Sequence, residues 1–117
     1  MFLKANHHEL DIIKISRALV GECYSITRCF PSEERFILNS QIRRASISVY
    51  LNVSEGCGRK SINERKRFFE ISRASVTEVD AAFDIADDLG YCKNLDLKNL
   101  ANYIQRSYSM LCKMIKN

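Results

Sequence analysis

Apolar residues recur at every third or fourth position through nearly the whole chain of 117 residues, and this spacing restricts the fold more than any other feature. The alternation of apolar and polar residues that is typical of strands is almost absent. Only four glycines and one proline interrupt the pattern, so little of the chain can be turn or loop. The chain is also short enough for one hydrophobic core. We therefore predict an all-α protein with a single domain over residues 1–117.

Three breaks divide the pattern into four helices. Pro31 stops the first helix, Gly56 and Gly58 stop the second, and Gly90 stops the third. Long helices that are joined by short turns predict an antiparallel up-down four-helix bundle. The expected core stripes are Ile12, Ile15, Leu19, Cys23, Ile26 and Phe30; Leu38, Ile42, Ala45, Val49, Val53 and Gly56; Phe69, Ser72, Val76, Val79, Phe83, Ala86 and Leu89; and Leu97, Leu100, Ile104, Tyr108, Leu111 and Ile115.

Capping residues predict the helix boundaries more closely. The first helix should run from about Asn6 to Cys29. The second helix should end at residues 56–58 (Gly-Cys-Gly), because glycine at a helix end can adopt the left-handed conformation without strain. The expected N-caps are Ser32 for the second helix, Ser61 with Glu64 in a capping box for the third, and Asn94 or Asp96 for the fourth.

The third helix carries its charges in an unusual order. Residues 59–73 contain six basic and two acidic side chains, whereas residues 74–90 contain five acidic side chains and no basic one. The helix macrodipole favours the opposite order by ~0.3–1 kcal/mol per charge. The inversion suggests that these charges serve a contact outside the helix, with an anionic partner, another subunit or neighbouring helices.

Basic residues near the start of this helix are candidates for binding the phosphates of nucleic acid: Arg59, Lys60, Arg65, Lys66 and Arg67. The net charge of +4 is modest, so one such patch would bind weakly, and several copies in an oligomer would bind more tightly. Two alternatives remain open. The patch could be an ordinary solvated helix face, or it could contact the acidic half of the third helix in a neighbouring subunit.

Charged residues also lie among the apolar stripes. Arg43 and Arg44 are in the middle of the second helix, and the stem of Arg44 is expected to be partly buried. Glu78 lies on a second stripe of the third helix, which widens the apolar face beyond what one neighbouring helix needs: Ile71, Ser75, Ala82 and Ile85. Because a buried charge needs a partner, Glu78 is expected to pair with an arginine of the second helix or of another subunit.

The end of the second helix carries two further polar residues, Asn52 and Glu55, which are expected to bond the backbone of the following turn. Among the five scattered cysteines there is no C-x-x-C pair, so neither a disulfide framework nor a zinc site is expected. Cys57 lies between two glycines and is expected to be the exposed, oxidisable thiol.

The chain contains no recognisable catalytic arrangement. His7 and His8 are adjacent and lack the Glu-x-x-His pairs of metal sites in helical bundles. We therefore expect no enzymatic activity, no metal and no cofactor. The apolar runs are far shorter than the ~20 residues that span a bilayer, and no signal peptide is visible, so a cytoplasmic protein is expected.

An ordered set of short motifs resembles a known small family, the four-helix-bundle proteins encoded in intervening sequences of bacterial 23S rRNA genes. Members of this family also include the accessory protein of diversity-generating retroelements. The motifs are residues 30–34 (FPSEE), 40–45 (SQIRRA), 52–59 (NVSEGCGR), 68–69 (FF), 74–75 (AS), Glu78 and 88–91 (DLGY). The chain departs from the family pattern at Ile37, where glycine is usual, and at residues 53–54, where Ile-Ala is usual.

This resemblance implies an all-α bundle that assembles as a ring-like homopentamer with no known catalytic activity. In the retroelement branch it implies a basic surface that binds nucleic acid and a reverse transcriptase. The family-pattern positions are Gln41, Arg43, Arg44, Asn52, Glu55, Gly56, Gly58, Arg59 and Glu78. We therefore expect a non-enzymatic homo-oligomer that binds RNA or DNA. A protein-interaction scaffold that binds no nucleic acid is the alternative.

Overall fold

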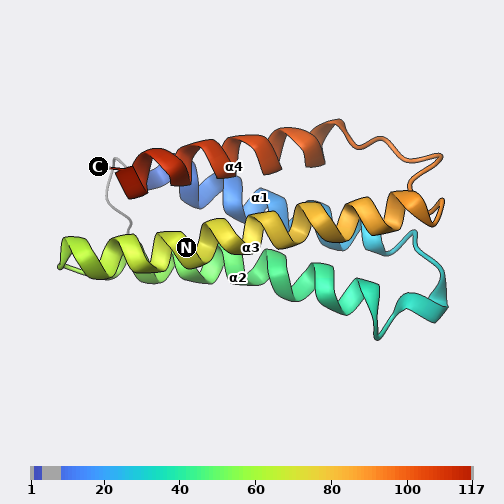
Figure 1. Cartoon of the computed structure of the whole chain (residues 1–117), viewed down its shortest axis with the longest axis horizontal. Helices are drawn as coiled ribbons and strands as arrows, with labels where there is room; N and C mark the ends of the chain where they lie inside the picture. The colour runs from blue at the N-terminus through green and yellow to red at the C-terminus, as the bar shows by residue number, and fades with distance from the viewer. Residues whose placement is uncertain (1, 4–8, 117) are drawn as a thin grey trace.

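A computed structural model describes residues 2–3 and 9–116, and in them four helices form an elongated bundle of 43 × 24 × 24 Å (Figure 1). The helices are α1 (Leu10–Thr27), α2 (Leu38–Gly58), α3 (Ile62–Asp88) and α4 (Lys98–Lys116), and the short 3-10 turn η2 spans Ser32–Glu34. Consecutive helices are antiparallel, and α4 also packs on α1, so each helix has two neighbours. The described residues contain no strand, and none of their helices is long and apolar enough to cross a membrane.

The predicted stripes form the core. All six residues of the first stripe and all six of the second are buried, and the third is buried from Phe69 to Ala86. The fourth stripe is only partly correct: Leu100 and Leu111 are buried, whereas Tyr108 is 44% exposed. Leu89, at the end of the third stripe, is 54% exposed. The prediction of an all-α four-helix bundle is confirmed, and these two residues lie on its surface.

Small side chains allow α2 and α3 to approach closely. The hydroxyls of Ser48 and Ser75 are hydrogen-bonded across the interface at 2.8 Å, and Ser72 donates to the Val49 carbonyl at 2.8 Å. Gly56 contributes by lacking a side chain, because a Cβ there would lie 2.5 Å from the Phe69 ring. The left-handed conformation predicted for the end of the second helix is wrong, because neither Gly56 nor Gly58 adopts it. Gly56 lies inside α2 with ordinary backbone angles, and close packing rather than a left-handed cap requires glycine.

Several helix boundaries differ from those predicted. Asn6 to His8 lie outside the described residues, and α1 ends at Thr27 rather than Cys29. The second helix begins at Leu38 and not directly after Ser32, because Ser32–Glu34 forms a 3-10 turn. Tyr91 fixes this turn by donating a hydrogen bond of 2.7 Å to Glu34. That bond raises the pKa of Tyr91 to about 12.

Caps are confirmed at Ser61, Asp96 and Gly90, although the second bond of the predicted capping box, from the Ser61 amide to the Glu64 side chain, is not formed. The Ser61 hydroxyl accepts from the Glu64 amide at 3.3 Å, and Asp96 accepts from the Lys98 amide at 3.0 Å. Gly90 has φ +83°, and it ends α3 in a Schellman motif. In that motif the Tyr91 amide donates to the Ala86 carbonyl and the Gly90 amide donates to the Asp87 carbonyl.

We predict that Gly56→Ala destabilises the protein, because the added methyl group overlaps the Phe69 ring. Overpacking of this kind costs about 1–3 kcal/mol. Gly21→Ala is the matched control. Gly21 also lies inside a helix but has no atom within 4 Å of its added Cβ, so this change should stabilise by about 0.5–1 kcal/mol. Urea denaturation of both variants measures the difference, and an equal effect of the two changes would contradict the packing role.

Candidate nucleic-acid interface

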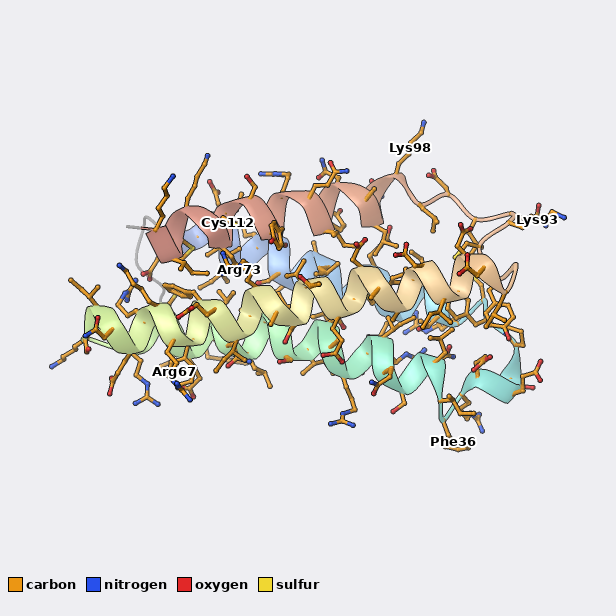
Figure 2. The ribbon with its side chains drawn as sticks, viewed as in Figure 1. Phe36, Arg67, Arg73, Lys93, Lys98 and Cys112 are labelled. Atoms are coloured by element: carbon orange, nitrogen blue, oxygen red, sulfur yellow. The ribbon has the colours of Figure 1, made fainter. Side chains whose placement is uncertain are left out.

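The bundle has a basic end and an acidic end. The basic end is the α2–α3 turn together with the end of α4, and it carries the cations Arg59, Lys60, Arg65, Lys66, Arg67, Lys113 and Lys116, together with the acids Glu9, Glu55 and Glu64. At the opposite, acidic end lie Glu33, Glu34, Asp84, Asp87, Asp88 and Asp96, together with the cations Arg28, Arg35, Lys93 and Lys98. Figure 2 shows the two ends, with Arg67 near one and Lys93 at the other. The antiparallel fold thus separates the charges along its long axis.

The fold itself accounts for part of the charge inversion on α3. The start of α3 lies beside the end of α2, whose macrodipole favours cations there. At the other end, the acids of α3 lie near the start of α2, whose macrodipole favours anions. The unfavourable interaction of these charges with the macrodipole of α3 is therefore offset by their favourable interaction with α2, its antiparallel neighbour. Consequently the inversion does not by itself require an external partner.

Arg65 is a structural residue and not a free phosphate ligand. Its side chain is 27% exposed and forms an ion pair with Glu9, whose side chain is 8% exposed. The same guanidinium donates to the carbonyls of Cys57 at 3.0 Å and Arg59 at 3.2 Å, at the end of α2. Arg65 thereby holds the α2–α3 turn closed and ties it to the start of α1. Since these contacts engage both terminal nitrogens of the guanidinium, the prediction that Arg65 binds phosphate is not supported.

Arg59 is exposed but already has partners. It forms an ion pair with Glu55 at 3.1 Å, one turn earlier, and its guanidinium lies 5.0 Å from the centre of the Phe68 ring. Glu55 thus bonds a side chain of the turn and not its backbone. Asn52 bonds neither, because its amide donates to the Ser48 carbonyl at 2.9 Å and hydroxyl at 3.1 Å. The predicted role of these two residues in bonding the turn backbone is therefore wrong.

The remaining cations of the predicted set are free to bind an anion. Lys60 and Arg67 are exposed and Lys66 is half-buried. None of the three forms an ion pair with a residue in the described part of the chain. Figure 2 shows Arg67 projecting away from the bundle. These three residues, with Arg59 beside them, are the candidate interface. Gly58 closes α2 next to them, and a Cβ added there would have no atom within 4 Å.

The two arginines of α2 have roles that the sequence did not distinguish. Arg43 is half-buried, donates to the Thr27 hydroxyl at 2.9 Å and stacks over the Tyr24 ring at 4.5 Å, which ties α2 to α1. Arg44 is exposed as a whole residue, and the partial burial of its stem stays a prediction. Glu78 is exposed as well and forms no ion pair with a described residue.

Gln41, Arg44 and Glu78 meet on the surface between α2 and α3. They line a shallow hollow of about 250 Å³ together with Ala45 and Ser48. The ion pair predicted between Glu78 and an arginine of the second helix is not formed among the described residues. The burial from which it was predicted is also absent, because Glu78 is exposed. An ion pair with another subunit remains a prediction.

A family model matches residues 8–113, which is nearly the whole chain, and its description is 23S rRNA-intervening sequence protein. The chain belongs to this family. No curated protein sequence matches it. The family assignment agrees with the resemblance of the motifs. The matched region also includes α1 and most of α4, which the motifs do not cover.

The thiols of this intervening-sequence protein differ from expectation. Cys57 is only half-exposed, and burial together with the nearby Glu9 carboxylate raises its pKa to about 12. The exposed thiol is Cys29, at the end of α1. Cys57 is therefore a poor nucleophile at neutral pH, and the prediction that it is the oxidisable cysteine is wrong. His7 and His8 lie outside the described residues.

We predict that Arg65→Ala destabilises the protein by about 2–3 kcal/mol, because it leaves the buried Glu9 carboxylate without its counter-charge. Arg67→Ala is the control: it removes the same guanidinium two residues away at an exposed position, and a surface change of this kind alters stability by less than about 0.5 kcal/mol. Thermal unfolding of both variants tests this, and an Arg65→Ala protein as stable as the control would show that the ion pair does not hold the turn.

Proposed function

We propose that this family member is a non-enzymatic homo-oligomer that binds the backbone of RNA or DNA through its basic end. The observation that supports this most strongly is that Lys60, Lys66 and Arg67 form no ion pair with a described residue. They lie beside a turn that Arg65 holds closed. A rigid turn presents these charges in a fixed arrangement, which lowers the entropic cost of binding. Contacts of this kind recognise phosphates and not base sequence.

Self-association is the second part of the proposal, and the outer face of α2 and α3 supports it. This outer face is defined by the hollow at Gln41, Arg44 and Glu78 and by exposed apolar residues on either side of it: Ile37, Leu51, Ile71 and Ile85, with exposed fractions of 68, 54, 40 and 53%. Exposed apolar side chains that gather on one face are typical of protein–protein contact surfaces. The hollow brings Arg44 and Glu78 together, so the same face on two copies would offer both charges of an ion pair.

The family resemblance favours a homopentamer. A pentamer of chains that each carry a net charge of +4 would carry +20, which converts a weak patch into a strong field around the assembly. Multiple basic ends would also bind one nucleic acid together, so affinity would rise without any new contact. The partners in this proposal are a nucleic acid and further copies of the chain, with a reverse transcriptase or another protein as an additional partner.

The rival function is a protein-interaction scaffold without nucleic-acid binding. The two-ended charge distribution favours it specifically, since the basic end of one copy could contact the acidic end of another. Salt separates the two functions. Nucleic-acid affinity should fall with salt by a slope of about −0.9 per neutralised phosphate on duplex DNA. In the scaffold, salt should change the oligomer mass and no nucleic acid should bind.

We predict that the triple variant Lys60→Ala/Lys66→Ala/Arg67→Ala lowers affinity for a short RNA at least tenfold and reduces the salt slope by about two to three. The control is Arg28→Ala/Lys93→Ala/Lys98→Ala, which removes the same net charge from the acidic end. Fluorescence anisotropy at several salt concentrations measures both. Equal losses in the two variants would show that net charge alone, and not the basic end, determines binding.

We also predict that Ile71→Glu and Ile85→Glu lower the oligomer mass, because each places a charge within the apolar part of the outer face. Ala101→Glu is the control, since Ala101 is exposed on α4, away from that face. Light scattering gives the mass of each variant. If all three proteins have the same mass as the wild-type chain, the outer face of α2 and α3 is not the assembly surface.

A further inference from the structure

A groove lies between α3 and α4, away from the outer face of α2 and α3. It has a volume of about 550 Å³ and is lined by Val76, Thr77, Asp80, Ile104, Gln105 and Tyr108. Its floor is apolar, whereas Thr77, Asp80 and Gln105 bring hydrogen-bonding groups. Tyr108 is 44% exposed, which is unusual for a residue that the sequence pattern assigns to the core. An aromatic ring that is left on the surface of a polar groove is available to stack on a ligand.

The basic end leads directly into this groove. On α3, the residues Lys66, Glu70, Arg73, Thr77 and Asp80 are spaced three or four apart and so lie on one side of the helix. On α4, Tyr108, Cys112 and Lys116 form the facing row by the same spacing. Figure 2 shows Arg73 and Cys112 next to each other where the two helices meet. Cations therefore lie at the outer part of the row, and the carboxylate of Asp80 lies further in.

Arg73 is placed to receive a phosphate at the mouth of the groove. Its guanidinium donates to the Cys112 thiol at 3.6 Å, which is a weak acceptor, and it forms no ion pair with a described residue. Most of its donors are thus available. Glu70 lies one turn before Arg73 and lowers the local positive potential, while Lys66 and Lys116 raise it.

We propose that this groove binds one unpaired nucleobase of a single-stranded nucleic acid, with the base stacked on Tyr108 and the adjoining phosphate on Arg73. This inference rests on the proposed nucleic-acid binding and adds the form of the ligand. Single-stranded nucleic acids bind proteins by stacking bases on aromatic side chains, and the exposed base edges are then hydrogen-bonded. A base paired in a duplex cannot enter a groove of this kind without leaving its helix.

Asp80 determines which base fits. An ionised carboxylate only accepts hydrogen bonds, so it requires a base edge that presents N–H donors. Guanine presents two adjacent donors, its ring N–H and its amino group, to a single carboxylate. Uracil has no amino group to offer. The groove should therefore prefer guanine, with Thr77 and Gln105 available to its remaining polar atoms.

The test uses fluorescence anisotropy with the full chain and a labelled single-stranded 12-mer of uridine that contains one central guanosine. The comparison ligands are the same strand with inosine in place of guanosine, a 12-mer of uridine alone, and the guanosine strand annealed to its complement. We expect the guanosine strand to bind about fivefold more tightly than the inosine strand, which lacks the amino group. Asp80→Asn should abolish this preference. Equal affinity of the wild-type chain for the guanosine and inosine strands would overturn the role of Asp80.

Tyr108 is tested by replacements that keep the protein folded. Tyr108→Leu should lower affinity for the single strand about tenfold, whereas Tyr108→Phe keeps the ring and should bind like the wild-type chain. Phe36→Ala is the control, because Phe36 is 83% exposed at the acidic end. If Tyr108→Leu binds the single strand as tightly as this control does, the groove does not bind a base. If the triple variant of the basic end still loses affinity in that case, the proposed function stands without the groove. Absence of any binding by the wild-type chain overturns the proposed function as well.

Discussion

Close packing of α2 on α3 is the constraint on which the rest of the structure depends. Ser48 and Ser75 are hydrogen-bonded across the interface, and the missing side chain of Gly56 makes room for Phe69. Because the two helices are this close at the turn, Arg65 can reach the carbonyls at the end of α2 while it pairs with Glu9. The same packing leaves one face of the pair uncovered and separates the charges of α3 along the bundle.

The order of charges on α3 is tolerated by the fold, and its cations serve two roles. The antiparallel neighbour α2 offsets the unfavourable interaction with the macrodipole of α3, so the fold tolerates the order. Of the cations that cluster there, Arg65 and Arg59 are engaged in contacts within the chain, and Lys60, Lys66 and Arg67 form no ion pair with a described residue. One sequence feature therefore divides into a structural part that closes the turn and a part that is free to bind.

The helical repeat was enough to predict the four helices and most of the core, since burial of Leu19 or Val79 follows from spacing alone. Contacts between distant residues could not be predicted in this way. Arg65 looked like its free neighbours because its partner, Glu9, is 56 residues away in the sequence. Tyr108 continues an apolar stripe but is 44% exposed, because its burial depends on how α4 packs on its neighbours and not on spacing alone. For Gly56, sequence cannot separate a required turn conformation from a required absence of side chain.

The central claim is that nucleic acid binds at the basic end and along the α3–α4 groove. Nuclear magnetic resonance tests it most directly, by following the backbone amides of the labelled chain during titration with a single-stranded RNA. The account predicts that the shifts concentrate in residues 59–80 and 104–116, with few changes near Ser32–Glu34 or residues 84–98. Shifts that concentrate at the acidic end, or an absence of shifts at any RNA concentration, would contradict it.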